Sequence, residues 1–168
     1  MSSSSPPQPP QIARRLEFYP VQVIGLLLII VIPVLALLGV FGASYAHEQR
    51  ASADLEIEID YASRLRYKTL ENLHVSVRNL TNQTVSILTL RFGGSYIDQF
   101  SSVVFTPSVE QIADGYYEVL LSDIRPGETR TVTVEIKGER YGLHQGIVAA
   151  AADGLEGIEV DIATLTFP

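Results

Sequence analysis

The feature that most constrains this chain is an uncharged apolar run from Val21 to Ala46, VQVIGLLLIIVIPVLALLGVFGASYA. A helix rises about 1.5 Å per residue, so a hydrocarbon core of about 30 Å needs about 20 apolar residues. The run exceeds that length and predicts one transmembrane helix over residues 20–46. Pro33 lies inside the run and predicts a kink near the middle of the membrane.

The charges that flank the run predict its orientation. Arg14 and Arg15 precede it, whereas the residues after it carry charges of both signs. Because basic residues favour the cytoplasmic side, we expect the N-terminus inside and the C-terminal part outside. The alternative is a cleaved signal peptide, since Ser44 and Ala46 would form a small-residue cleavage site. The apolar run is longer than the 7 to 15 residues typical of such peptides, which favours the anchor.

Composition divides the rest of the chain. Residues 1–19 begin with a Ser/Pro/Gln-rich stretch, which predicts a disordered cytoplasmic tail followed by a juxtamembrane segment. Residues 47–53 are polar and predict a linker. Residues 54–168 are long enough for one extracytoplasmic domain.

Charge and cysteine content exclude several functions. Residues 47–168 contain ten Lys or Arg against eighteen Asp or Glu, a net charge of −8, which argues against binding nucleic acid or an anionic membrane surface. The chain has no cysteine, so disulfides and thiolate metal sites are excluded. A small external domain without disulfides is typical of bacteria, and we expect the bacterial inner membrane, with the domain periplasmic or extracellular.

The hydrophobic pattern after residue 53 has a period of two. Leu55, Ile57, Ile59 and Tyr61 alternate with acidic residues, which predicts a half-buried strand. Further strands are predicted at 73–78, 85–92, 100–106, 116–121, 129–137, 143–152 and 158–167, with turn residues between them. Seven or eight short strands without a helical period predict an all-β fold, a single antiparallel β-sandwich.

A resemblance supports this fold over roughly residues 55–167. The segment 123–129, DIRPGET, the strand after it and the segment YGLHQGIVA at 141–149 resemble the closing strands of bacterial immunoglobulin-like domains of the CARDB and NEW3 type. LHVSVRN at 73–79 is similar to an earlier strand of that family. The resemblance implies an immunoglobulin-like β-sandwich and no particular activity.

The sequence contains no known catalytic or metal-binding motif. The sequence contains no G-x-S-x-G motif, and His47, His74 and His144 lack the i, i+4 spacing of a helical metal site. We therefore expect no enzyme activity, no cofactor, no metal, no small-molecule substrate and no nucleic acid.

Acidic side chains gather on the outer faces of the first and last predicted strands. Glu56, Glu58 and Asp60 share the outer face of the first strand, and Glu159 and Asp161 share the outer face of the last strand. If these strands lie side by side, the five carboxylates form one stripe that needs compensation. The candidates are internal pairing with Arg64, Arg66, Arg78 or Arg91, a protein partner, or calcium, for which the D-x-D-x-D-G pattern is missing.

Small residues in the apolar run predict a second contact. Ala36, Gly39 and Ala43 follow Pro33 at the spacing of one helix face, where small side chains allow another helix to approach closely. Such residues are also common in helices without a partner. Partners expected here are the lipid bilayer and integral membrane subunits.

These observations predict a non-catalytic, single-pass accessory or scaffold subunit that presents its external domain as part of a larger membrane complex. The alternative is a membrane-anchored binding module for cell-wall polymer or another surface protein. Tyr96, Tyr116 and Tyr117 are the candidate aromatic residues for stacking on sugar.

Overall fold

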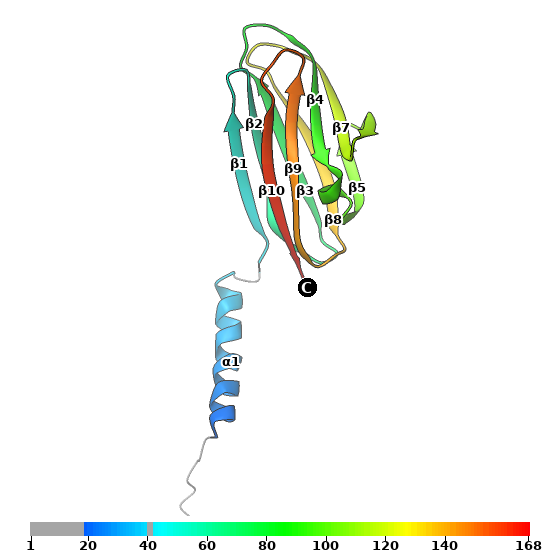
Figure 1. Ribbon diagram of the computed structural model, residues 1–168. Coiled ribbons are helices and arrows are strands. Elements are labelled where there is room, and N and C mark those ends of the chain that lie inside the picture. Colours follow the sequence, from blue (N-terminus) through cyan, green and yellow to red (C-terminus); the bar gives the residue numbers. More distant parts are fainter. Residues whose placement is uncertain (1–18, 40–41) are drawn as a thin grey trace, which may run out of the picture. The chain divides into compact units, whose positions relative to one another are not determined.

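The computed structural model describes residues 19–39 and 42–168, which form two compact units that divide between Phe41 and Gly42. Residues 1–18 of the expected tail and juxtamembrane segment, including Arg14 and Arg15, lie outside the described residues. The first unit contains helix α1, Pro20–Leu37 (Figure 1). Pro20 suits the first turn because its missing N–H needs no partner there.

Helix α1 is long and apolar enough to cross a membrane, and it lies near the N-terminus. An anchor and a signal sequence both have this length and composition. The helix includes Pro33 and ends at Leu37, before the expected Ala46. Gly39 ends it, since its φ of +76° is a left-handed conformation that glycine adopts without strain.

This ending corrects the expected small-residue stripe. Ala36 is helical, whereas Gly39 and Ala43 lie outside the helix and do not continue its face. The expected linker at 47–53 also differs, because Ser44–Ala51 forms strand β1. The sequence of β1 is polar and mostly exposed, so it has no apolar alternation that would reveal a strand.

The second unit is an all-β domain with ten strands in its described residues. All eight predicted segments form strands, and β1 and β6 are added. The bounds are β2 Leu55–Arg66, β3 Leu70–Asn79, β4 Val85–Gly93, β5 Phe100–Thr106, β6 Gln111–Ala113, β7 Tyr116–Ile124, β8 Thr129–Gly138, β9 Gly142–Ala152 and β10 Ile158–Phe167, with a four-residue helix α2, Gly94–Ile97.

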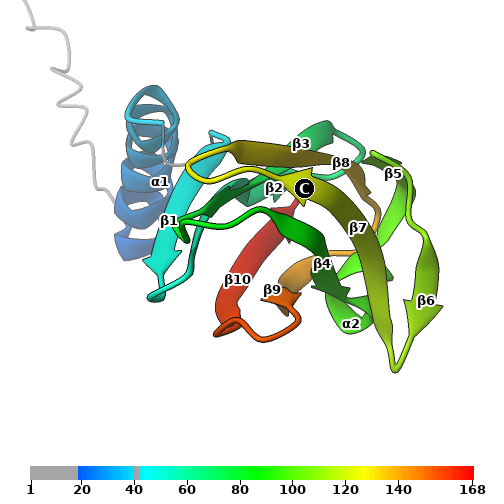
Figure 2. The ribbon, with the colours of Figure 1, turned by 90° about the horizontal axis from the view of Figure 1, so that it is seen from above.

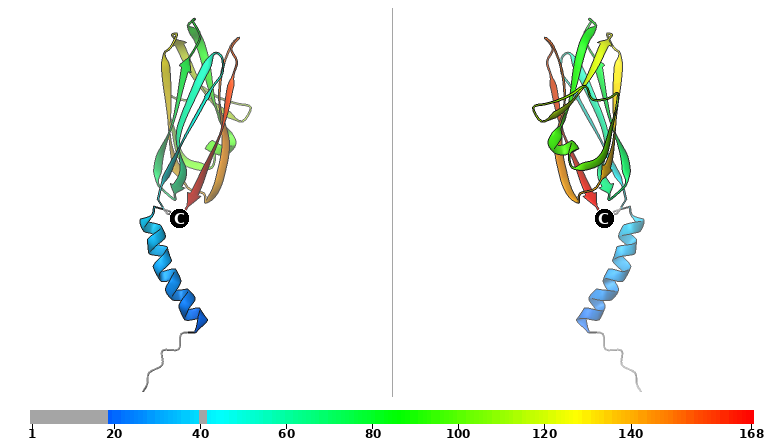
Figure 3. Two further views of the ribbon diagram at one scale, coloured as in Figure 1. Left: turned by 90° about the vertical axis from the view of Figure 1, so that its left-hand side faces the viewer. Right: turned by 90° about the vertical axis from the view of Figure 1, so that its right-hand side faces the viewer.

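The strands form one curled sheet in the order β5-β8-β3-β2-β10-β9-β4-β7-β6, and β1 pairs with β2 beside this path. The curl brings β2, β3 and β8 over β10, β9 and β4 (Figures 2 and 3). Every pairing is antiparallel except that of β2 with β10, which is parallel over Arg64–Arg66 and Leu165–Phe167. The sheet is therefore mixed, not strictly antiparallel as expected.

The core lies between the two halves of the curl. Inward residues of β2, β3 and β8 are fully buried, among them Ile57, Val75 and Val134 at 0% exposure. They pack in one cluster with inward residues of β4, β9 and β10, such as Leu90, Val148 and Val160. Alternation in the sequence thus predicts correctly which face of each strand is buried.

Val134→Asp tests this core. The substitution places an unpaired carboxylate among apolar side chains, so we expect the free energy of unfolding to fall by at least about 2 kcal/mol. Thr129→Asp on the exposed face of the same strand is the matched control and should change it little. Chemical denaturation followed by circular dichroism measures both, and equal stability of the two variants would contradict the assignment of β8.

Candidate functional site

The five carboxylates of the expected stripe occupy two separate places. The direct neighbours of Glu58 and Asp60 on β2 are β1 on one side and β3 on the other. Glu159 and Asp161 on β10 lie opposite Ala149 and Ile147 of β9. Because β1 occupies the place beside this part of β2, and β10 reaches β2 only at Arg64–Arg66, the single stripe does not form.

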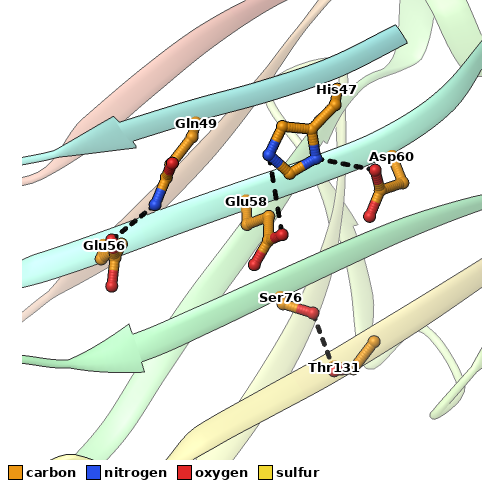
Figure 4. A network of polar contacts seen from close by, with 7 residues as sticks. All are labelled: His47, Gln49, Glu56, Glu58, Asp60, Ser76 and Thr131. Atoms are coloured by element: carbon orange, nitrogen blue, oxygen red, sulfur yellow. Dashed lines mark hydrogen bonds and ion pairs between the residues drawn. The ribbon is translucent and has the colours of Figure 1, made fainter.

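The β2 carboxylates belong to a network of polar contacts with β1 (Figure 4). Nδ1 of His47 lies 2.8 Å from Oδ1 of Asp60, and its Nε2 lies 3.7 Å from Oε1 of Glu58. Gln49 donates a hydrogen bond of 2.8 Å to Glu56. The expected internal pairing is therefore present, and much of it comes from β1.

The arginines contribute to this pairing unequally. Arg78 lies 3.8 Å from Glu56, as the sequence allowed. Arg91 instead forms an ion pair of 2.7 Å with Glu118, which is 4% exposed. Gln111 also donates a hydrogen bond to Glu118, and this bond, followed by the charge of Arg91, holds the pKa of Glu118 below its ordinary value.

His47, Glu58 and Asp60 are the group of potential metal ligands in the described part of the chain, with one ligand atom of each within 4.8 Å of the others. An imidazole with two carboxylates suits a divalent transition metal better than calcium, which prefers oxygen ligands. All three side chains are exposed, and the hydrogen bond and ion pair of His47 already account for their arrangement.

A hollow of about 960 Å³ lies over the outer face of β10, β9 and β4. Asp161 of β10 and Glu48 of β1 line it on one side, and Asp114 and Tyr116 of the β6–β7 hairpin line it on the other. We call this feature the acidic hollow. Its three carboxylates are exposed, and the structure shows no hydrogen bond or ion pair for any of them within residues 42–168.

Small residues form part of the lining of the acidic hollow. Gly93, Gly94 and Gly146 line it without side chains that would fill it. A Cβ on Gly146 would lie 2.2 Å from Cβ of Tyr96, so glycine is required for Tyr96 to pack beneath β9. The close approach of α2 therefore explains this glycine.

The three tyrosines expected to stack on sugar have different environments. Tyr96 is 1% exposed and its hydroxyl lies 2.9 Å from that of Thr164, so it is a core residue. Burial raises the pKa of Tyr96 to about 12. Tyr117 donates a hydrogen bond to Asp98 and stacks on Phe105. Tyr116 is the one that lines the acidic hollow.

A second hollow, of about 590 Å³, continues from Tyr116 along the same face. Arg50, Arg91, Glu156 and Glu159 line it. Arg50 donates a hydrogen bond of 2.7 Å to the backbone oxygen of Glu159. Because Arg91 is paired with Glu118, both cations already have partners. Within residues 42–168 the structure shows no side-chain hydrogen bond or ion pair for Glu156 or Glu159, so the negative charge of the acidic hollow continues into this second hollow.

Sequence reasoning identified Asp161 and Tyr116 but missed Glu48 and Asp114. Glu48 lies in the unrecognised strand β1, and Asp114 lies in the turn of the β6–β7 hairpin at a φ of 51°. The Asp114-Gly115 pair signals a turn, yet nothing in the sequence shows that this turn approaches β10.

Comparison with known proteins shows similarity of structure only. No protein-family profile matches the sequence, and no curated protein matches it. A conjugative transposon lipoprotein from Bacteroides eggerthii is 14% identical, with 67% of this chain and 98% of that chain covered and a TM-score of 0.45. The CARDB domain of a Pyrococcus furiosus protein, in complex with two metal ions, is 14% identical. The match covers 70% of this chain and 97% of that chain, with a TM-score of 0.44.

The bacterial hydrophobin BslA is 9% identical. The match covers 75% of this chain and 100% of that chain, with a TM-score of 0.37. The neighbours thus include the CARDB type of domain that the sequence resembles, a resemblance of fold alone. With TM-scores below 0.5, these likenesses carry nothing about binding or activity.

The contact between His47 and Asp60 predicts a pH dependence. The hydrogen bond that Nδ1 of His47 donates to the Asp60 carboxylate is the main cause that raises the pKa of His47 above 6.5. A raised pKa in the folded state means that the contact stabilises the domain below the unfolded-state pKa, and that this stability is lost as the pH rises through the folded-state value. NMR titration should show the raised pKa.

Asp60→Asn should lower the pKa of His47 and remove this part of the pH dependence, whereas Asp123→Asn on β7 should not. An unchanged His47 titration in Asp60→Asn would show that the hydrogen bond is not made in solution.

Proposed function

We propose that this chain is a membrane-anchored, non-catalytic accessory subunit whose acidic hollow binds a positively charged, extended segment of a partner protein. The observation that carries the proposal is the set of Glu48, Asp114 and Asp161, three exposed carboxylates around one hollow that make no hydrogen bond or ion pair within residues 42–168. A concave site of a few hundred to a thousand Å³ with convergent polar groups is typical of a binding site.

The electrostatics of the acidic hollow favour a cationic ligand. Like charges around one concavity repel each other, and a Lys or Arg side chain placed between them relieves that repulsion. The net charge of −8 over residues 47–168 attracts such a ligand from a distance and disfavours an anionic one. The hollow continues into its neighbour at Tyr116, so an extended segment fits better than a single side chain.

The remaining parts of the proposal concern the membrane. Helix α1, long and apolar enough to cross a membrane, supports a single-pass anchor. We propose that this membrane is the bacterial inner membrane, with the N-terminus inside and the β domain periplasmic or extracellular. Integral membrane subunits are the proposed partners, and the lipid bilayer surrounds α1. The length of the uncharged apolar run from Val21 to Ala46 supports the anchor over a signal peptide, and the position of Arg14 and Arg15 supports the orientation.

Tyr116 favours a second candidate, a module that binds a cell-wall polymer. An aromatic ring beside carboxylates is an arrangement that can stack on a sugar and accept hydrogen bonds from its hydroxyls. Only one of the three expected tyrosines lines the acidic hollow, so this candidate has less support than a basic protein segment.

The orientation can be tested because the chain has no native cysteine. Single cysteines are introduced at Ser3 and, in a second variant, at exposed Ser108 of the β domain. We expect a membrane-impermeant maleimide to label Cys at 108 in intact spheroplasts and Cys at 3 only after lysis. Labelling of position 3 in intact spheroplasts would reverse the orientation.

Binding in the acidic hollow can be tested with the full chain in nanodiscs and a fluorescent lysine-rich peptide. The triple variant Glu48→Gln, Asp114→Asn, Asp161→Asn should weaken binding at least about tenfold, a loss of about 1.4 kcal/mol. Fluorescence anisotropy at increasing salt measures the affinity and its electrostatic part.

The matched control is Glu110→Gln, Asp123→Asn, Asp153→Asn, which removes the same charge from exposed positions outside the acidic hollow. Equal weakening by both triple variants would show that the peptide responds to net charge and not to this site. Soluble peptidoglycan fragments in the same assay, with Tyr116→Ala, test the second candidate.

A further inference from the structure

One end of the β domain contains the first residue of β1 and the last residue of β10 (Figure 1). The β2–β3 and β8–β9 connections lie at the same end, because Leu70 pairs with Lys137, and Tyr67 donates a backbone hydrogen bond to Phe167. We call this end the base and define it as Ser44–Tyr45, residues 64–71, residues 137–143 and Leu165–Phe167.

The base is basic although the domain as a whole is acidic. Residues 64–71 and 137–143 contain five cations, Arg64, Arg66, Lys68, Lys137 and Arg140, against Glu71 and Glu139. The turns of the opposite end, residues 52–54, 79–84, 123–130 and 153–157, contain five acidic residues against two arginines. The charge of the domain is therefore segregated along its long axis, which its total charge conceals.

Several cations of the base are available to a ligand. Among the described residues no carboxylate pairs with Arg66, Lys68 or Arg140. Lys68 lies 5.3 Å from the centre of the Tyr67 ring, and Arg140 donates a hydrogen bond of 3.2 Å to Gln99. These three side chains are exposed.

Large apolar and aromatic side chains are exposed at the same end of the domain as these cations. Tyr141 is 58% exposed and packs against Tyr67 with ring centres 4.8 Å apart and ring planes tilted by 36°. Leu143 is 60% exposed and lies opposite Leu165, which is 41% exposed. Exposed tyrosine and leucine beside Lys and Arg is the composition of protein surfaces that lie in the headgroup region of a bilayer.

Covalent geometry limits how far the base can be from the end of helix α1. Seven residue steps separate Leu37 from Ser44, and an extended chain covers at most about 3.6 Å per step, or roughly 25 Å. If α1 spans a bilayer, this limit keeps the base within reach of the lipid headgroups. The opposite, acidic end lies at the far end of strands ten or more residues long.

We propose that the base binds the anionic lipid headgroups of the bilayer that α1 spans. Arg66, Lys68 and Arg140 contact lipid phosphates, while Tyr141 and Leu143 enter the interface. This inference rests on the proposed anchor, because it requires α1 in the membrane. The acidic hollow is then held at a limited distance from the bilayer and can be reached by a segment that emerges from it.

The experiment uses the full chain in nanodiscs of phosphatidylcholine, with or without phosphatidylglycerol, and single spin-labelled cysteines. A label at Leu143 reports the base, a label at exposed Ile87 reports the opposite half of the domain, and a label at Leu27 reports α1. Collision with oxygen and with a nickel chelate measures the depth of each label. We expect the Leu143 label at the interface in discs that contain phosphatidylglycerol, and the Ile87 label in water.

Lys68→Glu with Arg140→Glu should move the Leu143 label into water. The control, Arg125→Glu with Arg130→Glu at the acidic end, should leave it at the interface. A Leu143 label that is in water throughout, or that does not respond to lipid charge or to the Lys68 and Arg140 changes, overturns the proposal. The Leu27 label separates the two hypotheses, since its exposure to water would refute the anchor itself.

Discussion

The apolar interior between the two halves of the curled sheet is the interaction on which the domain depends. The chain has no cysteine, so no disulfide assists it. Ile57, Val75 and Val134 on one half and Leu90, Val148 and Val160 on the other are almost completely buried. A core of this kind fixes the register of each strand, because a shift by one residue would exchange its buried and exposed faces. Charged side chains are thereby assigned to the outside.

The sequence predicts this interior well because alternation is a local property. Leu55 to Tyr61 already shows which side chains of β2 are buried. It predicts β1 poorly, because His47 to Arg50 are polar on both faces and the strand exists only through pairing with β2. It also places the end of α1 too late, because the apolar run continues beyond Gly39, whose conformation ends the helix.

The candidate sites show where local reasoning fails. Glu58 and Asp161 look equivalent in sequence, yet one contacts His47 and the other faces a hollow. The difference depends on which strands lie beside them, and pairing between distant segments is not encoded in either segment alone. Segregation of charge has the same origin, since Lys68 and Arg140 are far apart in sequence and meet at the base through the pairing of β3 with β8.

The short connection between α1 and β1, seven residue steps from Leu37 to Ser44, has a mechanical consequence. Any tension between helix and domain acts at Ser44, the first residue of a strand that runs away from the base. A pull at this point loads the hydrogen bonds between β1 and β2 along the strand axis, so that they share the force in shear and do not open one after another. Strand β1 therefore makes the domain resistant to being pulled apart from its own N-terminal end.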